Sequence, residues 1–474
     1  MSERLSVDIC VIGAGSGGLS VAAGASQMGA SVVLVEKGKM GGDCLNYGCV
    51  PSKALLAAAK AAATVRGAVA FGVNGHEPAI DFARVHQHVR SAIAAIAPMD
   101  SVERFTGLGV RVIQAPARFL GAQEVEAGEV RISARRIVVA TGSRPAAPPI
   151  PGLDNVPYLT NETIFEMPSR PEHLIVIGGG PIGVEMAQAH RRLGSRVSLI
   201  ESMELLGKDD PELVAVVRRR LQAEGVEIRE QSSVLRVDRA GNGVAVQLKC
   251  ETGEDRIEGS DLLVAAGRRP CLDGLDLERA DIAYTEKGIT VDSRLRTTNK
   301  RIFAVGDVAG GYQFTHAANY HAGIVIRNAL FRLPARVDYR ALPWVTYTDP
   351  ELAQVGMTEA AARKQLAKIR LLRWPFHDND RAHTERTLEG MAKVVTTSRG
   401  RILGAGIVGA HAGELILPWA LAISQGMGIG KMASLIAPYP SLSEVSKRAA
   451  ASFFTPSLFG ERTRRVVRFL ARFG

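Results

Sequence analysis

VDICVIGAGSGGLSVAAGASQMGASVVLVE, residues 7–36, decides the first part of the fold. A short apolar strand leads into a glycine-rich turn, an alanine-rich helix follows, and a second apolar strand ends at Glu36. The turn carries three glycines in the spacing GxGxxG, namely Gly13, Gly15 and Gly18. In such a unit the first glycine makes the tight turn, the second lets a pyrophosphate approach the backbone, and the third allows close helix–strand packing. The helix N-terminus attracts phosphate and the acid accepts from a ribose hydroxyl, so the stretch predicts a dinucleotide site.

The same pattern recurs about 165 residues later. A strand over 174–177 precedes a turn with Gly178, Gly180 and Gly183, and a strand over 196–200 ends at Glu201. Two complete units predict an α/β fold with two Rossmann-type dinucleotide-binding domains. A carboxylate at Glu201 would accept from a ribose 2′-hydroxyl and repel a 2′-phosphate, so NADH is predicted over NADPH.

The remaining apolar segments predict the rest of the architecture. Residues 301–307 form a strand that closes on Gly-Asp, and after about residue 342 the Rossmann pattern stops. The mixed pattern beyond that point predicts an α+β domain with strands over 391–395 and 402–408 and helices over 414–425 and 441–451.

Composition and charge exclude several classes of function. The 474 residues suffice for two to four domains. The net charge is +10, but residues 445–474 hold seven basic residues against one acid, so the rest of the chain is nearly neutral and no nucleic-acid binding is predicted. Five cysteines are too few for a disulfide scaffold, and no uninterrupted apolar run reaches the ~18–20 residues of a membrane span. We therefore expect a cytoplasmic protein in which a disulfide would be catalytic.

The segment GGDCLNYGCVPSK, residues 41–53, places two of the cysteines five residues apart. On a straight α-helix the Cα atoms of such a pair lie ~8–9 Å apart, whereas a disulfide needs less than ~7 Å. Cys44 and Cys49 can therefore pair only if the helix is distorted between them, and Gly48 permits that. Cys10 and Cys250 lie in strand-like runs and Cys271 in a turn, and no chemistry is assigned to them.

This segment, between two Rossmann units, resembles the flavoprotein disulfide reductases, the family that includes dihydrolipoamide dehydrogenase, glutathione reductase and mercuric reductase. The resemblance extends over almost the whole chain through the motifs ATGSRP (140–145), GRRP (267–270), GD (306–307) and TDPE (348–351). It implies FAD and NAD(H) as cofactors and a homodimer whose sites are completed by the partner's third domain. It also implies five segments: the FAD-binding domain in two parts (1–148 and 271–341), the NAD(P)-binding domain (149–270), the dimerisation domain (342–460) and a basic tail (461–474).

The resemblance further implies roles for single residues. Cys44 would be the exposed thiol that meets the substrate, Cys49 would lie against the flavin as a thiolate, and Lys53 with Glu185 would form a buried ion pair beside the flavin. The expected cofactor-binding set comprises, besides Lys53 and the glycines and acids of the two turns, Lys37, Gly42, Asp43, Ala117, Thr141, Gly142, Gly267, Gly306, Asp307, Phe314, Thr315 and His316. No resident metal site is expected.

The chain departs from the family at YPSLSE, residues 439–444. Most disulfide reductases have a catalytic histidine where this chain has Tyr439, and tyrosine titrates near ~10, too high for an efficient base. Glu444 keeps the family's acidic position, but Ser441-x-x-Glu444 also fits a helix capping box. The tyrosine resembles mercuric reductase, yet this chain lacks the vicinal cysteines that usually end that enzyme.

We therefore predict a mercuric-reductase-like enzyme that reduces a metal ion, a small disulfide or a quinone. Two alternatives stay open at this point. One is dihydrolipoamide dehydrogenase proper, and the other is a membrane-docked electron-transfer partner without a soluble small substrate.

The tail over 461–473 is amphipathic when wound as a helix at about 100° per residue. Its apolar arc holds Val466, Val467, Phe469, Leu470 and Phe473, and its basic arc is expected to hold Arg462, Arg464, Arg465, Arg468 and Arg472. Such a helix either packs on its own domain with a solvated basic face or docks on an anionic membrane or a membrane protein. In the second case the protein would sit peripherally at the inner face of the membrane.

Overall fold

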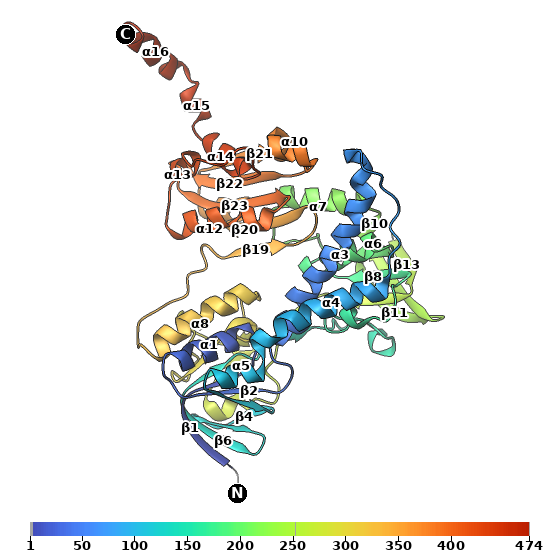
Figure 1. Ribbon diagram of the computed structural model, residues 1–474, viewed down its shortest axis with the longest axis vertical. Helices are drawn as coiled ribbons and strands as arrows, with labels where there is room; N and C mark the ends of the chain where they lie inside the picture. Colours follow the sequence, from blue (N-terminus) through green and yellow to red (C-terminus); the bar gives the residue numbers. More distant parts are fainter. Residues whose placement is uncertain (1–2, 252, 474) are drawn as a thin grey trace. The chain divides into compact units, whose positions relative to one another are not determined.

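The computed structural model describes residues 3–251 and 253–473 and divides into two compact units (Figure 1). The first unit combines the residues up to 202 with 231–337, and the second combines 203–230 with the residues from 338 onward. The segment 203–230 therefore groups with the second unit, although the predicted NAD(P)-binding domain includes it. The five-segment division remains a prediction about domains, since compactness alone does not assign them.

The first unit is built on a mainly parallel sheet whose central strands are buried. Its order is β3-β2-β1-β6-β5-β4, and β18 pairs with β6 on the other side. The strands are β1 (Glu3–Ile12), β2 (Val32–Glu36), β3 (Val110–Gln114), β4 (Ala117–Gly121), β5 (Glu124–Ala127), β6 (Val130–Val139) and β18 (Ile302–Ala304). β18 belongs to a segment about 160 residues after β6, so the chain returns to complete its first sheet, and the predicted strand over 301–307 is shortened to three residues.

Helices cover this sheet and carry the segments of interest. α1 (Ser16–Gln27) packs against α8 (Thr315–Ala329), with Leu19, Ala22 and Val325 in one core (Figure 1). The other helices of this part are α2 (Gly42–Asn46), α3 (Cys49–Gly67), α4 (Phe82–Ile96) and α5 (Val102–Gly107). The predicted helix after the first glycine turn is confirmed, but it begins at Ser16, three residues earlier than expected.

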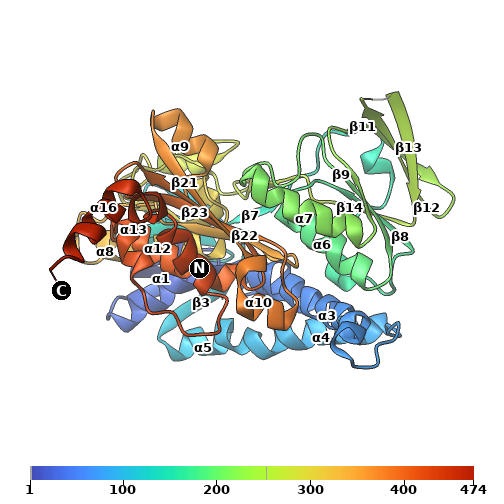
Figure 2. The ribbon, with the colours of Figure 1, turned by 90° about the horizontal axis from the view of Figure 1, so that it is seen from above.

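The second Rossmann unit repeats this arrangement on a smaller scale. β8 (His173–Ile177) lies between β9 (Arg196–Ile200) and β14 (Asp261–Val264), all parallel, and α6 (Pro181–Arg192) follows the glycine turn. An antiparallel sheet of β11 (Ser233–Ala240), β12 (Gly243–Cys250) and β13 (Gly253–Gly259) lies beyond it (Figure 2). Short strands complete the first unit: β7 (Ser143–Pro145), β15 (Arg268–Pro270), β16 (Tyr284–Thr285) and β17 (Gly288–Ile289).

The second unit contains a five-stranded antiparallel sheet in the order β19-β20-β23-β22-β21. These strands are β19 (Pro343–Thr346), β20 (Glu351–Gly356), β21 (Ile369–Pro375), β22 (Met391–Thr397) and β23 (Ile402–Gly409). Its other elements are α7 (Pro211–Ala223), β10 (Val226–Arg229), α9 (Glu359–Gln365), α10 (Asp380–Glu385), α11 (Ala412–Leu415), α12 (Leu417–Ser424), α13 (Ile429–Ala433), α14 (Glu444–Ala451), α15 (Thr455–Leu458) and α16 (Glu461–Leu470). The predicted helix over 414–425 is therefore two helices, and Pro418 lies in the first turn of the second, where its missing N–H costs least.

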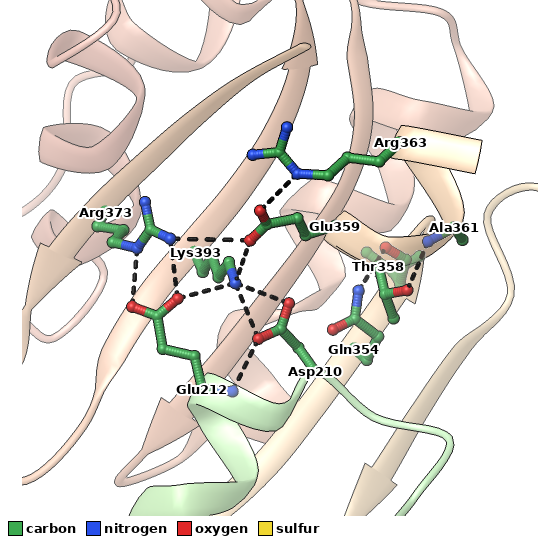
Figure 3. A network of polar contacts seen from close by, with 10 residues as sticks. Asp210, Glu212, Gln354, Thr358, Glu359, Ala361, Arg363, Arg373 and Lys393 are labelled. Carbon is green, nitrogen blue, oxygen red and sulfur yellow. Dashed lines mark hydrogen bonds and ion pairs between the residues drawn. The ribbon is translucent and has the colours of Figure 1, made fainter. Parts of the chain in front are cut away.

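A buried lysine ties α7 to this sheet (Figure 3). Lys393 on β22 has a side chain that is 4% exposed, and its Nζ lies 2.8 Å from carboxylate oxygens of Asp210, Glu212 and Glu359. Arg373 on β21 also binds Glu212, and it lowers the pKa of that carboxyl, with help from Lys393, to about 2. These ion pairs explain why 203–230 belongs with the second unit, because an unpaired buried lysine would be costly.

Among the described residues, one helical stretch over 42–71 is long and apolar enough to cross a membrane. It nevertheless carries three charges that are paired within the first unit: Asp43 with Arg268, Lys53 with Glu185 and Arg66 with Glu77. We interpret it as part of that unit, since length and composition alone are weak grounds for a span.

Candidate functional site

The first glycine turn has a different spatial need at each of its glycines. Gly13 has a φ of +106°, and a Cβ there would lie 2.4 Å from the carbonyl oxygen of Ala140. A Cβ on Gly18 would lie 1.9 Å from the carbonyl oxygen of Gly13. Gly15, between them, has no atom within 4 Å of the place where a Cβ would be. The outer glycines are thus required by packing, whereas the middle one borders open space in front of the N-terminus of α1.

The second turn reproduces this geometry closely. A Cβ would lie 2.5 Å from the Ala265 carbonyl oxygen at Gly178 and 1.8 Å from the Gly178 carbonyl oxygen at Gly183, while Gly180 has open space. Two turns that agree to within about 0.1 Å at both tight contacts are the same structural device, with room for a phosphate at the same point.

Each turn is also held by the acid that ends the neighbouring strand. Glu36 accepts from the Ala14 N–H at 2.6 Å and from the Gly38 N–H at 2.7 Å. Glu201 accepts from the Gly179 N–H at 2.7 Å. A carboxylate has about four lone-pair sites, so each acid keeps capacity for a ribose hydroxyl.

The two cysteines lie on different helices. α2 ends at Asn46, α3 begins at Cys49, and Gly48 between them adopts a non-helical conformation. A Cβ on Gly48 would lie 2.9 Å from a carboxylate oxygen of Asp43, so the break also needs a small residue. The predicted distortion is therefore present at the predicted glycine, and both cysteines are free thiols in this structure.

The two thiols have opposite electrostatic character. A hydrogen bond from the Cys44 thiol is the main cause that lowers the pKa of Cys49 to about 6, with smaller contributions from Thr315 and the Lys53 ammonium. The same hydrogen bond and burial raise the pKa of Cys44. Cys49 is the better thiolate of the pair, because it receives a hydrogen bond and lies near a cation.

The solvent exposure of the two thiols is the reverse of what the resemblance implied, since Cys44 was expected to be the exposed one. Cys49 is exposed and Cys44 is half-buried. The Cys49 sulfur lies 3.4 Å from the hydroxyl of Thr315, the first residue of α8.

Lys53 and Glu185 form the expected ion pair. The Lys53 Nζ donates to Glu185 at 2.8 Å, and the Glu185 side chain is 5% exposed. Lys53 comes from α3, one turn after Cys49, and Glu185 from α6, so the pair joins the cysteine helix to the second glycine turn's helix.

Asp307 is the centre of a second polar group. Its carboxylate accepts from the Ser143 hydroxyl at 2.5 Å, and burial raises its pKa. Arg268 donates to the same hydroxyl at 2.8 Å and pairs with Asp43 at 3.0 Å. Three motifs from distant parts of the chain thus meet at Ser143. The neighbouring Thr141 donates to the Cys271 carbonyl.

Most of the remaining predicted cofactor residues lie around these two groups. Gly142, Gly306 and Gly42 have positive φ angles of 69°, 68° and 59°. Phe314 and His316 stack with ring centroids 5.2 Å apart at the start of α8, on either side of Thr315. Gly267 precedes β15, Lys37 follows β2, and Ala117 begins β4, where it pairs with Ala127.

In the second unit, the side chain of Tyr439 is hydrogen-bonded to Asp380 and not to Glu444, the acid of its own motif. Its hydroxyl donates to Asp380 at 2.8 Å, and this bond, more than any other cause, raises the pKa of Tyr439. The ring is 70% exposed. Glu444 is largely shielded and its nearest ion-pair partner is Arg448 at 4.0 Å.

The capping-box interpretation of Ser441 and Glu444 is wrong. α14 begins at Glu444, its N-cap is Ser443, and Ser443 makes no side-chain capping bond. Ser441 instead donates to the Pro438 carbonyl at 2.6 Å. The loop before α14 is tighter than a capping box, so the helix starts three residues later than the sequence predicted.

Four residues of these groups were not singled out from the sequence: Ser143, Arg268, Asn161 and Asp380. Ser143 and Arg268 lie inside the motifs at 140–145 and 267–270, so those motifs contained the signal. Asn161 donates to Asp43 at 3.0 Å, and, like Asp380, it is a single polar residue outside any motif. In the described part of the chain no cluster of three histidine, cysteine or acidic side chains could hold a metal ion.

Comparison with known families and proteins agrees with this geometry. Residues 7–322 match the family described as pyridine nucleotide-disulphide oxidoreductase, and residues 342–450 match its dimerisation domain. A mercuric reductase from Streptomyces lividans is 36% identical over 458 residues, which cover 94% of this chain and 96% of that protein. A dihydrolipoyl dehydrogenase from Thermus scotoductus is 35% identical over the same coverage.

A solved structure is also similar. It is the Cu(II) complex of the HOCl-induced flavoprotein disulfide reductase RclA from Escherichia coli, with a TM-score of 0.84 and 28% identity. The match covers 93% of this chain and 99% of that one.

Proposed function

Since the chain belongs to the pyridine nucleotide-disulphide oxidoreductase family and is thus a flavin-dependent enzyme, we propose that it reduces a small electrophilic acceptor with electrons from NADH through Cys44 and Cys49. The observation that carries this proposal is the thiol pair itself. One thiol has a pKa of about 6 and a neighbouring ammonium, and the other holds its proton, as a dithiol poised to transfer an electron pair requires.

The residues of the first unit fit the family's cofactors, FAD and NAD(P)H. The open space at Gly15, with Glu36 and the helix N-terminus of α1, would hold the diphosphate and adenosine side of FAD, and Asp307 the ribityl chain. Gly180 and Glu201 would do the same for the nicotinamide nucleotide. Bound FAD supplies the conversion of a hydride into an electron pair that a disulfide can accept.

The protein's own groups manage charge and protons around that chemistry. Lys53 and Thr315 stabilise negative charge on the Cys49 sulfur, and Glu185 holds the Lys53 ammonium in place. The reduced pair carries two electrons and up to two protons. It gives up both electrons, and any protons it holds, when it closes to a disulfide while the acceptor is reduced.

The protonation state of Tyr439 limits which class of electron acceptor the enzyme can reduce. Asp380 raises the pKa of the Tyr439 hydroxyl, so at neutral pH this group is protonated and cannot serve as a general base. Disulfide and dithiol substrates need a group that moves the thiol proton, whereas a metal ion takes electrons without taking up a proton. We therefore favour a metal ion as the acceptor, in line with the mercuric reductase relatives and the Cu(II) complex of the structural neighbour.

The family's dimerisation domain indicates a homodimer. The second unit offers a surface for it, since Leu417, Leu421, Leu435 and Ile436 are all exposed apolar side chains. In the dimer, the partner's Tyr439 would complete each site.

Steady-state NADH oxidation with Hg(II), Cu(II), quinones, lipoamide and glutathione disulfide tests the proposal. We expect turnover with at least one metal ion, and weak turnover with both disulfides. Fast lipoamide turnover would instead identify a dihydrolipoyl dehydrogenase, and no turnover with any acceptor would favour a dedicated protein or membrane partner.

A further inference from the structure

The helix α16 leaves its apolar side exposed as well as its polar side. None of its residues is buried, and Val466, Val467, Phe469 and Leu470 are each between 55% and 59% exposed. Phe473, just beyond it, is 75% exposed and packs only its ring edge on Phe469. In Figure 1 the helix extends away from the sheet of its own unit. The interpretation that the tail packs on its own domain is therefore wrong for the described residues.

The arginines of α16 are arranged to one side, with one correction to the expected pattern. At about 100° per residue, Arg464, Arg465, Arg468 and Arg472 fall within an arc of about 100°, opposite the apolar side chains. Arg462 instead falls inside the apolar arc, about 20° from both Phe469 and Phe473. The only acid on the helix, Glu461, pairs with Arg465 at 3.1 Å, so the basic arc keeps a clear excess of positive charge.

Charge decides between two occupants of this surface. Leu417, Leu421, Leu435 and Ile436 are also exposed, but residues 412–438 hold one lysine, Lys431, and no arginine, so this segment suits a second copy of the chain. The α16 surface combines apolar side chains with basic ones on one short helix. Such a pattern fits the boundary of an anionic lipid leaflet, where the apolar arc enters the acyl region and arginines reach the headgroups.

We propose that α16 docks the enzyme peripherally on an anionic lipid surface. The helix has ten residues and is about 15 Å long, so it is too short to span a bilayer and would lie in the interface. Leu458 and Phe459, exposed just before α16, extend the apolar area. The inference does not depend on which acceptor the enzyme reduces.

The test uses the full-length, flavin-containing protein and vesicles of phosphatidylcholine with about 30% phosphatidylglycerol. We expect the protein to co-sediment at low salt, to be released near 1 M salt, where the screening length is about 3 Å, and to bind pure phosphatidylcholine far more weakly. Arg464→Gln with Arg468→Gln removes two charges from the basic arc. At the usual strength of an arginine near an anionic surface, this should weaken binding by about 30-fold.

Two further double variants show whether vesicle binding depends on α16 itself or only on net charge. Lys364→Gln with Lys368→Gln removes the same charge from exposed positions elsewhere in the second unit and should leave binding unchanged. Val466→Ser with Leu470→Ser keeps every charge but should also weaken binding. Equal loss in both charge variants would reduce the effect to net charge and overturn the proposal, and so would an absence of binding by the wild type.

The oligomeric state identifies the competing occupant. If Val466→Ser with Leu470→Ser converts a dimer to a monomer in light scattering, and vesicle binding is absent, a second copy covers the helix. Because sedimentation needs no turnover, failure of this proposal is distinguishable from failure of the proposed activity.

Discussion

The two glycine turns and the loop at 439–444 belong to the same enzyme but relate differently to its family. The turns agree with each other to about 0.1 Å at both tight contacts and keep the acids at both strand ends. The loop has exchanged the family's histidine for Tyr439, whose hydroxyl is bound by Asp380 rather than by Glu444. Under the proposed function, the turns are the retained, electron-supplying half of the enzyme and the loop is the changed half that would face the acceptor.

The contrast has a physical basis. At the two outer glycines of each turn a Cβ would lie 1.8–2.5 Å from a carbonyl oxygen, so a side chain at those positions would disrupt the turn. Tyr439 is 70% exposed, and its replacement disturbs little beyond one hydrogen bond. Surface loops on rigid scaffolds are therefore the places where a new acceptor can be accommodated.

The largest effect on activity is expected from a substitution in the retained half, at Cys49. Cys49→Ser removes the thiol with the low pKa, so acceptor reduction should fall by about 10³-fold or more, because a reacting atom is lost. Anaerobic titration should show electron uptake falling from four to two per subunit. Cys271→Ser, a change to a half-buried thiol outside the site, is the control. A Cys49→Ser enzyme with normal turnover would contradict the assignment of the pair.

Lys393→Met tests the stability of the second unit, because Lys393 lies in a buried ion-pair network and has no proposed role in the reaction. The substitution leaves Asp210, Glu212 and Glu359 without their shared cation, and breaking a buried pair typically costs 3–5 kcal/mol. We expect about 3 kcal/mol in denaturant unfolding, since Arg373 remains beside Glu212. Lys364→Met on exposed α9 should cost less than about 0.5 kcal/mol.

The loss of stability in Lys393→Met should become smaller as the pH falls. The folded-state pKa of Glu212 is lowered to about 2 from an ordinary value near 4.5. Its contribution to stability is therefore present above pH 4.5 and lost as the pH falls toward 2. The difference between wild type and Lys393→Met should shrink over that window, and a difference that grows in acid would contradict the ion-pair explanation.

Tyr439→His tests the changed half directly. Restoring a base with a pKa near working pH should raise lipoamide turnover by about 10²-fold, the lower end of what general acid–base catalysis contributes. Tyr439→Phe removes the hydroxyl without adding a base and should leave lipoamide turnover low. If Tyr439→His leaves lipoamide turnover low while metal-ion reduction falls, the loop is specialised for the metal ion beyond the loss of a base.

Glu201→Gln tests whether the carboxylate of Glu201 sets the preference for NADH over NADPH. Wild type should favour NADH over NADPH in kcat/KM, because the carboxylate repels a 2′-phosphate. The amide oxygen of glutamine can still accept from the Gly179 N–H, so the turn should survive, while the NADH preference should fall by about 10-fold. Glu204→Gln, two residues beyond Ser202 on the exposed surface, should leave the ratio unchanged.

The same contrast describes how far the sequence determines the structure. Glycine spacing predicts both turns because each glycine meets a local backbone requirement, and the break at Gly48 follows from helix geometry once Cys44 and Cys49 are expected to pair. The bond between Tyr439 and Asp380 joins residues 59 positions apart in different elements, and no local pattern specifies it. The tail shows a further limit, since amphipathicity predicts a helix but not whether its own domain covers the apolar side.

The smallest expected effect is a shift along the pH axis. With a pKa of about 6, Cys49 should be a thiolate at neutral pH, and the long-wavelength thiolate–flavin band of the two-electron-reduced enzyme should fade as the pH falls through about 6. If Cys44 were the thiolate, its raised pKa would keep the band absent at neutral pH. Lys53→Met removes a nearby cation, so the midpoint should move upward toward the ordinary value for a thiol. Lys60→Met, on the same helix but exposed two turns further on, should leave it in place, and an equal shift in both variants would mean that general field effects, rather than the position of Lys53, set the charge on Cys49.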